Sequence, residues 1–128
     1  MIRRRQMLIA AIAASLMTPA AAIAQAPTAS LNELIAKHAK ANGVPESLIH
    51  RICHEESRYH PRVVGGGGAM GLMQIKYTTA RGLGYRGPAS GLLDPDINLT
   101  WGVRYLAGAY RMAQGNAEVA RVLYGTGY

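Results

Sequence analysis

Apolar and polar positions follow a helical period over most of this chain. Apolar residues recur at intervals of three and four between positions 31 and 38, 48 and 53, and 99 and 113, which places them on one face of an α-helix. A half-buried strand would need strict alternation of apolar and polar residues, and no run of that kind is long enough to be convincing. The pattern therefore predicts an all-α fold.

Residues that cap or break helices mark the ends of these segments. Ser30-Leu31-Asn32-Glu33 has the pattern of a capping box, and Asn42-Gly43 suits the end of the helix that it starts. Pro45 is placed for the first turn of a second helix. A third helix is predicted from Met70 to Arg81, and Asp94-Pro95 starts the longest helix of the chain.

Glycine-rich and polar segments separate the predicted helices. Gly65 to Gly68 predict a loop, Pro88 to Leu93 predict another, and Gln114-Gly115-Asn116 predicts a turn. Apolar residues between positions 119 and 123 then predict a last short helix. The sequence shows no internal repeat, so we expect one helical domain with a modest core.

The first 26 residues have the pattern of a signal peptide. Arg3 to Arg5 precede the apolar run from Met7 to Met17, and Ala24-Gln25-Ala26 is a small-x-small cleavage site. Thr18-Pro19 interrupts the apolar run before the roughly 20 residues that a membrane-spanning helix needs. The segment Arg4 to Leu8 also loosely resembles a twin-arginine signal, so the export route stays open.

We therefore expect a cleaved signal peptide at residues 1–26 and a folded domain at residues 27–128. Neither a membrane anchor nor a cysteine for lipid attachment is expected near the cleavage site. The predicted location is periplasmic or secreted.

The charge of the chain narrows the choice of partner. The 14 basic and 7 acidic residues give a net charge of +7; without Arg3 to Arg5, 11 basic residues remain and the charge is +4. These residues are spread along the chain and are not gathered with aromatic residues as in a nucleic-acid binder, so no nucleic-acid partner is expected. A mildly basic surface suits an anionic polymer outside the cytoplasm, and an ordinary solvated surface fits equally well.

Cys53 is the only cysteine of the chain, which excludes an internal disulfide. It lies within an apolar helical pattern. We expect it to be a small buried core residue and not a reactive thiol.

Two adjacent glutamates end the second predicted helix, and helical geometry separates them. Glu56 follows Ile52 by four residues and is predicted to point inward with the apolar stripe. Glu55 is turned by about 100° and is expected to be solvated. Burial raises the pKa of a carboxyl group toward the range of a general acid. A glutamate held at the helix end by a neighbouring arginine is the alternative interpretation of Glu56.

The histidines do not form a recognisable metal motif. His50 and His54 share a helix face, but no third ligand has suitable spacing. His54-Glu55 begins like the motif of zinc proteases, although Arg58 stands where the second histidine is needed. Gly65 to Gly68 lack the Lys and Ser or Thr of a phosphate-binding loop. We expect neither a metal nor another cofactor.

The stretch from Glu55 to Ile75, EESRYHPRVVGGGGAMGLMQI, resembles the signature of the soluble lytic transglycosylases, which are relatives of goose-type lysozyme. That family typically shows Glu-Ser, then an aromatic residue and a proline, then Gly-Ala-x-Gly-Leu-Met-Gln. Several spaced motifs in the right order are more specific than any one of them. The matching positions are Glu56-Ser57, Tyr59, Pro61, Gly68 to Gln74, Asp94-Pro95, Asn98, Gly102, Tyr105-Leu106 and Tyr124.

Two segments depart from the family pattern. Gly125-Thr126-Gly127 stands where Asn-Ala-Gly follows the tyrosine, and Lys76-Tyr77 stands where a Met-Pro pair is common. Both changes concern sugar contacts at that end of the groove. Glu56 is not affected by them.

The resemblance implies a lysozyme-like domain that cleaves the β-1,4 bond between N-acetylmuramic acid and N-acetylglucosamine in peptidoglycan glycan strands. It makes Glu56 the proton donor and implies 1,6-anhydro products. Glycosidases that use water employ two carboxylates, and no second one is clearly placed here, because Asp94 before Pro95 is better explained as a helix cap. The alternatives are a hydrolytic muramidase of the same fold and an inactive glycan-binding or assembly-associated module. By analogy, a small domain of this type could also serve a secretion or appendage assembly apparatus that must pass the cell wall.

The resemblance also implies substrate-binding residues. It makes Gln74 a side chain that lines the glycan groove and Tyr124 an aromatic residue close to Glu56. Ser57 is expected either to bind substrate by a hydrogen bond or to end its helix. Met73 is expected to pack in the core or to form part of a shallow platform for a sugar.

Overall fold

Helices make up most of the structure. The computed structural model describes residues 27–128, so the predicted signal peptide lies outside its described part. The helices are α3 (Ala29–Asn42), α4 (Glu46–Ser57), α5 (Tyr77–Leu83), α6 (Pro95–Met112) and α7 (Ala117–Thr126), with 3₁₀ turns η2 (Gly66–Gly68) and η3 (Ala89–Leu93).

Pairing between extended segments is limited to two isolated bridges. Val64 pairs with Met70, and Met70 pairs with Ile75. No strand is assigned anywhere between residues 27 and 128. The predicted all-α fold is therefore confirmed.

The long helices begin and end at capping residues, with one correction. Thr28, and not Ser30, caps α3, because its hydroxyl accepts a hydrogen bond of 3.1 Å from the N–H of Leu31. Thr and Ser are both good capping residues. A cap at Thr28 starts the helix two residues earlier than a cap at Ser30, which adds backbone hydrogen bonds. Gly43 ends α3 in the left-handed conformation, and Asp94 caps α6 by accepting from Ile97 N–H, both as predicted.

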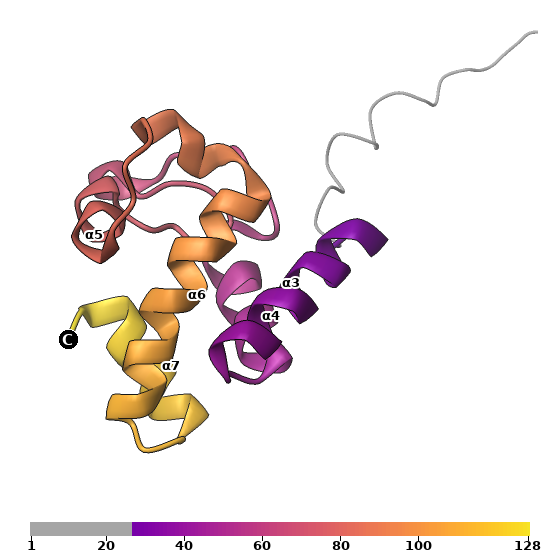
Figure 1. Cartoon of the computed structure of the whole chain (residues 1–128), viewed down its shortest axis with the longest axis vertical. Coiled ribbons are helices and arrows are strands. Elements are labelled where there is room, and N and C mark those ends of the chain that lie inside the picture. Colours follow the sequence, from indigo (N-terminus) through magenta and orange to yellow (C-terminus); the bar gives the residue numbers. More distant parts are fainter. Residues whose placement is uncertain (1–26) are drawn as a thin grey trace, which may run out of the picture.

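The main core lies where α3, α4 and α7 pack around α6 (Figure 1). Helices α3, α4 and α6 bury the apolar stripe that their period predicted. The prediction is wrong for α7, which exposes Val119 and Val122 and buries Ala120 and Tyr124. Cys53 is fully buried and free, as expected, and desolvation raises the pKa of its thiol to about 12. The largest buried side chains of this core are Ile35, Ile49, Ile52, Leu72, Met73, Leu99, Val103 and Leu106.

The predicted helix from Met70 to Arg81 is only partly correct. The structure places a tight turn at residues 70–75, closed by the bridge between Met70 and Ile75, and α5 begins at Tyr77. Gly71 and Gln74 have positive φ angles of 69° and 50°, which a right-handed helix does not allow. The turn is favoured because Gly71 fits against the side chain of Asn98, where an added Cβ would lie 2.5 Å from the amide nitrogen.

A second, smaller core lies at the other end of α6. Ile75, Ala80, Tyr85 and Leu92 form it, and Trp101 packs on it from α6. The segment predicted as a loop at Pro88 to Leu93 is largely the turn η3. Figure 1 shows α6 passing through the middle of the molecule, with α5 and the preceding loop near one end and α7 near the other. The functional side chains lie where these two regions meet.

No helix in the described range 27–128 is both long and apolar enough to cross a membrane.

Candidate active site

Glu55 and Glu56, the adjacent glutamates near the end of α4, differ in their partners. The carboxylate of Glu55 lies 3.1 Å from Nε of Arg51 and 3.5 Å from a guanidinium nitrogen of Arg121. Glu56 has no ion pair and no side-chain hydrogen bond with any residue of the described range 27–128. The arginine partners therefore belong to Glu55, and the interpretation of Glu56 as an arginine-bound helix end is not supported.

The prediction that Glu56 points into the core is wrong. Its side chain is exposed, and the next residue, Ser57, is buried. The angular argument holds, because Glu56 lies on the same side of α4 as Ile52 and Cys53. However, α4 ends at Ser57, and the last residue of this helix that belongs to the apolar core is Cys53, one turn earlier. Glu56 therefore stands at the edge of the core.

This position changes the acidity of Glu56. Partial loss of hydration raises the pKa of its carboxyl group above the ordinary value, and the negative charge of Glu55 raises it further. A carboxylic acid with a raised pKa keeps its proton at higher pH. That property suits a group that must donate a proton near neutral pH.

Tyr124 of α7 connects the core to the region around Glu56. Its ring is buried and meets Tyr105 edge-on at 5.4 Å between centroids. Its hydroxyl donates a hydrogen bond of 2.6 Å to the carbonyl oxygen of Met73. Burial raises the pKa of the Tyr124 phenol well above its usual value, and the charge of nearby Glu56 adds to the increase. Tyr124 therefore stays a neutral hydrogen-bond donor.

Gln74 closes the turn that precedes α5. Its side-chain amide donates to the carbonyl oxygens of Gly71 at 3.1 Å and Val63 at 3.2 Å, which stabilises its left-handed backbone. Its side-chain oxygen packs against Gly65 so closely that any side chain at that position would collide with it. The glycine loop is therefore shaped around Gln74.

Ser57 and Met73 face inward, away from the surface. The hydroxyl of Ser57 is shared between the carbonyl oxygens of Cys53 at 3.0 Å and Leu72 at 2.8 Å, so it ties the end of α4 to the turn before α5. The side chain of Met73 is completely buried. For these two residues, the structure supports the interpretations as helix end and core packing.

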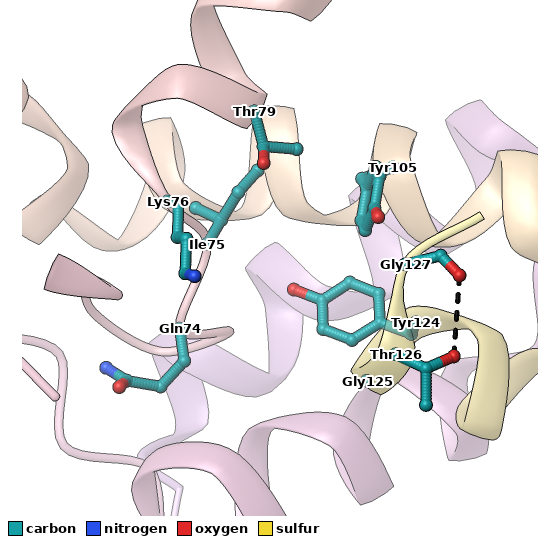
Figure 2. A pocket seen from close by; sticks show the side chains of 9 residues that line it. All are labelled: Gln74, Ile75, Lys76, Thr79, Tyr105, Tyr124, Gly125, Thr126 and Gly127. Atoms are coloured by element: carbon teal, nitrogen blue, oxygen red, sulfur yellow. Dashed lines mark hydrogen bonds between the residues drawn. The ribbon is translucent and has the colours of Figure 1, made fainter. Parts of the chain in front are cut away.

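A pocket of about 250 Å³ opens beside Tyr124 (Figure 2). Residues of the turn and of α5 form one side of it, and α6 and the end of α7 form the other. Glu56 does not line it. The lining residues are Gln74, Ile75, Lys76, Thr79, Tyr105, Tyr124, Gly125, Thr126 and Gly127.

The histidines of α4 contact an aromatic residue. Nδ1 of His50 lies 3.0 Å from the hydroxyl of Tyr59, and the ring of His54 lies 6.0 Å from the Tyr59 ring. Between residues 27 and 128, no group of three or more His, Cys, Asp or Glu side chains is arranged to hold a metal ion.

Asn98 is a residue to which the sequence assigned no role, although it fits the family pattern. Its fully buried amide accepts from the N–H of Met73 at 2.9 Å and donates to the carbonyl oxygens of Met70 and Leu92, both at 2.8 Å. Asn98 therefore attaches the turn that contains Gln74 to helix α6. A buried amide with three distant backbone partners has no local sequence signal.

Fold and site together define a helical domain of the lysozyme type, with one unpaired glutamate beside a buried tyrosine. Residues 33–128 match the family model of the transglycosylase SLT domain. The chain belongs to this family.

Curated relatives of this chain are much longer proteins. It is 33% identical over 97 residues to the peptidoglycan transglycosylase gp16 of Escherichia phage T7, covering 73% of this chain and 7% of that protein. It is 32% identical over 103 residues to the soluble lytic murein transglycosylase of Escherichia coli, covering 75% of this chain and 16% of that protein. The chain thus spans less than a fifth of the length of either relative.

Solved structures show the same fold. The crystal structure of the 70 kDa soluble lytic transglycosylase of Escherichia coli superposes with a TM-score of 0.70 at 29% identity, covering 75% of this chain and 16% of that one. An inactive glutamate-to-glutamine mutant of the lytic transglycosylase Slt of Pseudomonas aeruginosa superposes with a TM-score of 0.68, covering 74% and 16%.

Proposed function

We propose that this domain is a peptidoglycan lytic transglycosylase in which Glu56 is the acid and base. The observation that carries the proposal is the contrast between the two glutamates. Glu55 is neutralised by Arg51 and Arg121, whereas Glu56 has a raised pKa and stands unpaired next to Tyr124. Family membership and the names of the relatives support the same chemistry.

The reaction needs one carboxyl group in two protonation states. Protonated Glu56 donates its proton to the glycosidic oxygen, and the bond from that oxygen to C1 of the muramoyl residue breaks. The resulting carboxylate accepts a proton from the 6-hydroxyl of the same sugar as that oxygen bonds to C1. A 1,6-anhydro ring forms, Glu56 regains its proton, and no water is consumed.

Other acidic residues near the start of α6 are already engaged. Asp94 caps the helix, and Asp96 binds Nε2 of His38 at 2.6 Å and Nζ of Lys37 at 3.3 Å. The partners of Asp96 lower the pKa of its carboxyl group, His38 most of all. The occupation of both groups supports a reaction with a single carboxyl group over the two-carboxylate scheme of a hydrolase.

The other site residues support Glu56 in this proposal. Tyr124 presents a neutral phenol beside the acid, and Gln74 forms one wall of the glycan groove. Ser57 and Met73 act indirectly, because their side chains are buried and hold the turn that carries Gln74.

The first prediction separates the two glutamates. Glu56→Gln removes the proton that the reaction transfers while nearly keeping the shape, so we expect a loss of activity on purified peptidoglycan of about 100-fold or more. Glu55→Gln should keep most of the activity. Turbidity loss of sacculi measures the rate, and thermal unfolding shows that both variants remain folded.

Mass spectrometry of the released muropeptides identifies the reaction. Anhydro ends are lighter than reducing ends by one water. Reducing ends would contradict a transglycosylase in favour of a hydrolytic muramidase. Binding to sacculi without either product would favour the inactive glycan-binding module.

We also propose that residues 1–26 are a signal peptide and that residues 27–128 act in the periplasm or outside the cell. The support is the order of basic residues, apolar run and Ala24-Gln25-Ala26. The exported protein should begin at Pro27. N-terminal sequencing tests this, and an intact Met1 on the exported protein would contradict cleavage.

A further inference from the structure

Lys76 is the one charged residue among the nine that line the pocket beside Tyr124. It is exposed, and it forms no ion pair with any acidic residue in the range 27–128. Other basic residues on nearby helices, Arg51 and Arg121, already bind glutamates. The pocket therefore contains one positive charge that no carboxylate of the described part neutralises.

The position of Lys76 is set by the glycine loop. Gly67 has a positive φ angle of 68°, and a Cβ there would lie 3.2 Å from both Cε and Nζ of Lys76. The end of the lysine side chain thus packs over the η2 turn. Figure 2 shows its ammonium group pointing into the space that Tyr124 faces from the opposite wall.

Two hydroxyl groups of the pocket are already bound to the protein. The hydroxyl of Tyr124 donates to Met73, and the hydroxyl of Thr126 donates to the carbonyl oxygen of Val122 at 3.0 Å. The ammonium of Lys76 remains free to bind a ligand. Its neighbour across one turn of α5, Thr79, also faces the pocket (Figure 2).

We propose that Lys76 binds a carboxylate of the glycan substrate and makes this domain selective for anionic strands. A free cation in a pocket whose other lining residues are uncharged is a point of attraction for one negative group. The inference rests on the proposed function for the identity of the polymer.

Two kinds of carboxylate in peptidoglycan have the required chemistry. The lactyl group of muramic acid carries one when its peptide stem has been removed, and the stem carries others when it is present. Chitin oligosaccharides share the sugar backbone but have no carboxylate. The common feature that Lys76 would recognise is a carboxylate next to the muramoyl residue.

The test measures binding, so that it does not depend on catalysis. Glu56→Gln protein, with and without Lys76→Met, is titrated with soluble glycan strands that carry stems and with strands from which an amidase has removed them. Each strand preparation is also used after its carboxylates have been converted to amides. Methionine nearly preserves the length of the side chain and removes its charge. Lys40→Met, an equal loss of charge in the last turn of α3, is the matched control.

We expect Lys76→Met to weaken binding of unmodified strands about 2- to 5-fold, the range for one exposed ion pair, and to leave binding of amidated strands unchanged. The difference in affinity between proteins with Lys76 and with Lys76→Met should shrink at high salt. A loss confined to stripped strands would assign the lactyl carboxylate, and a loss confined to stem-bearing strands would assign the stem. Equal losses on amidated and unmodified strands, or no loss on either, would overturn the inference.

Failure of the proposed function gives a different result. If the unaltered protein makes no anhydro product while carboxylate-dependent binding through Lys76 persists, the proposed activity is wrong and the anion site stands. If anhydro products form and Lys76→Met changes no binding, the activity stands and the anion site is wrong.

Discussion

At the scale of single residues, the charge of Glu55 contributes to the raised pKa of Glu56 from the adjacent position. Loss of hydration is the main reason for the raised pKa of Glu56, and repulsion by Glu55 is the second. Arg51 and Arg121 partly offset that repulsion, because both bind Glu55. A pair of adjacent glutamates can therefore serve one catalytic role, with the second residue adjusting the first.

Glu55→Gln should shift the pH dependence of activity. Without the neighbouring negative charge, the pKa of Glu56 falls, so the protonated acid is lost at lower pH. We expect the alkaline limb of the kcat/KM profile to move to lower pH, while activity on the acidic side of the profile changes little. The measurement is the rate of muropeptide release across a pH series, with Glu33→Gln on α3 as control. A limb that stays in place or moves upward would contradict this coupling.

At the scale of elements, a closed ring of ion pairs joins α4 to α7. Arg51 binds Glu55 and Glu118, and Arg121 binds the same two glutamates, at distances from 2.6 to 3.5 Å. Exposed ion pairs contribute little one at a time, and networks contribute more. Arg121 lies one turn before Tyr124 in α7.

Arg121→Gln breaks two of the four pairs in this ring. We expect a small loss of stability that disappears at high salt, because screening already weakens exposed pairs there. Urea unfolding at low and high sodium chloride measures it. Arg62→Gln, at an exposed position without an ion pair in the described structure, is the control. A loss that is equally large at high salt would point to packing of the arginine stem and not to the ring.

At the scale of the whole molecule, Asn98 links the main core to the smaller one. Its side chain reaches the turn at residues 70–73 and the end of η3 from within α6. Together with the hydrogen bond from Tyr124 to the carbonyl oxygen of Met73, this buried amide keeps the pocket wall that carries Gln74 and Lys76 in place relative to Tyr124.

Asn98→Ala should be among the most damaging single substitutions in this domain. It leaves the N–H of Met73 and the carbonyl oxygen of Leu92 without the side chain that binds them, whereas the carbonyl oxygen of Met70 keeps its hydrogen bond from Ile75 N–H. Each such buried group costs about 1–3 kcal/mol, so we expect a loss of at least about 2 kcal/mol in the free energy of unfolding, measured by urea denaturation. Asn32→Ala on the exposed face of α3 is the control. A loss below about 1 kcal/mol would show that water or rearranged backbone satisfies these groups.

Local patterns in the sequence determined the helices and most of their ends. The caps at Asp94 and Gly43 and the apolar faces of α3, α4 and α6 depend on residues a few positions apart, so a period and a capping residue are enough to predict them. In α7 the period alone was misleading, because Val119 and Val122 are exposed and the buried face is formed by Ala120 and Tyr124.

Tertiary structure alone decided the features that depend on distant residues. The turn at Met70 to Ile75 replaces a helix because Asn98, 25 residues after Met73, binds its backbone. Glu56 is exposed because the core ends where α4 ends, and Glu55 is neutralised in part by Arg121 from another helix. The sequence selected Glu56 by its angle around the helix and by a family motif. Its environment depends on how the helices pack, which a local pattern does not encode.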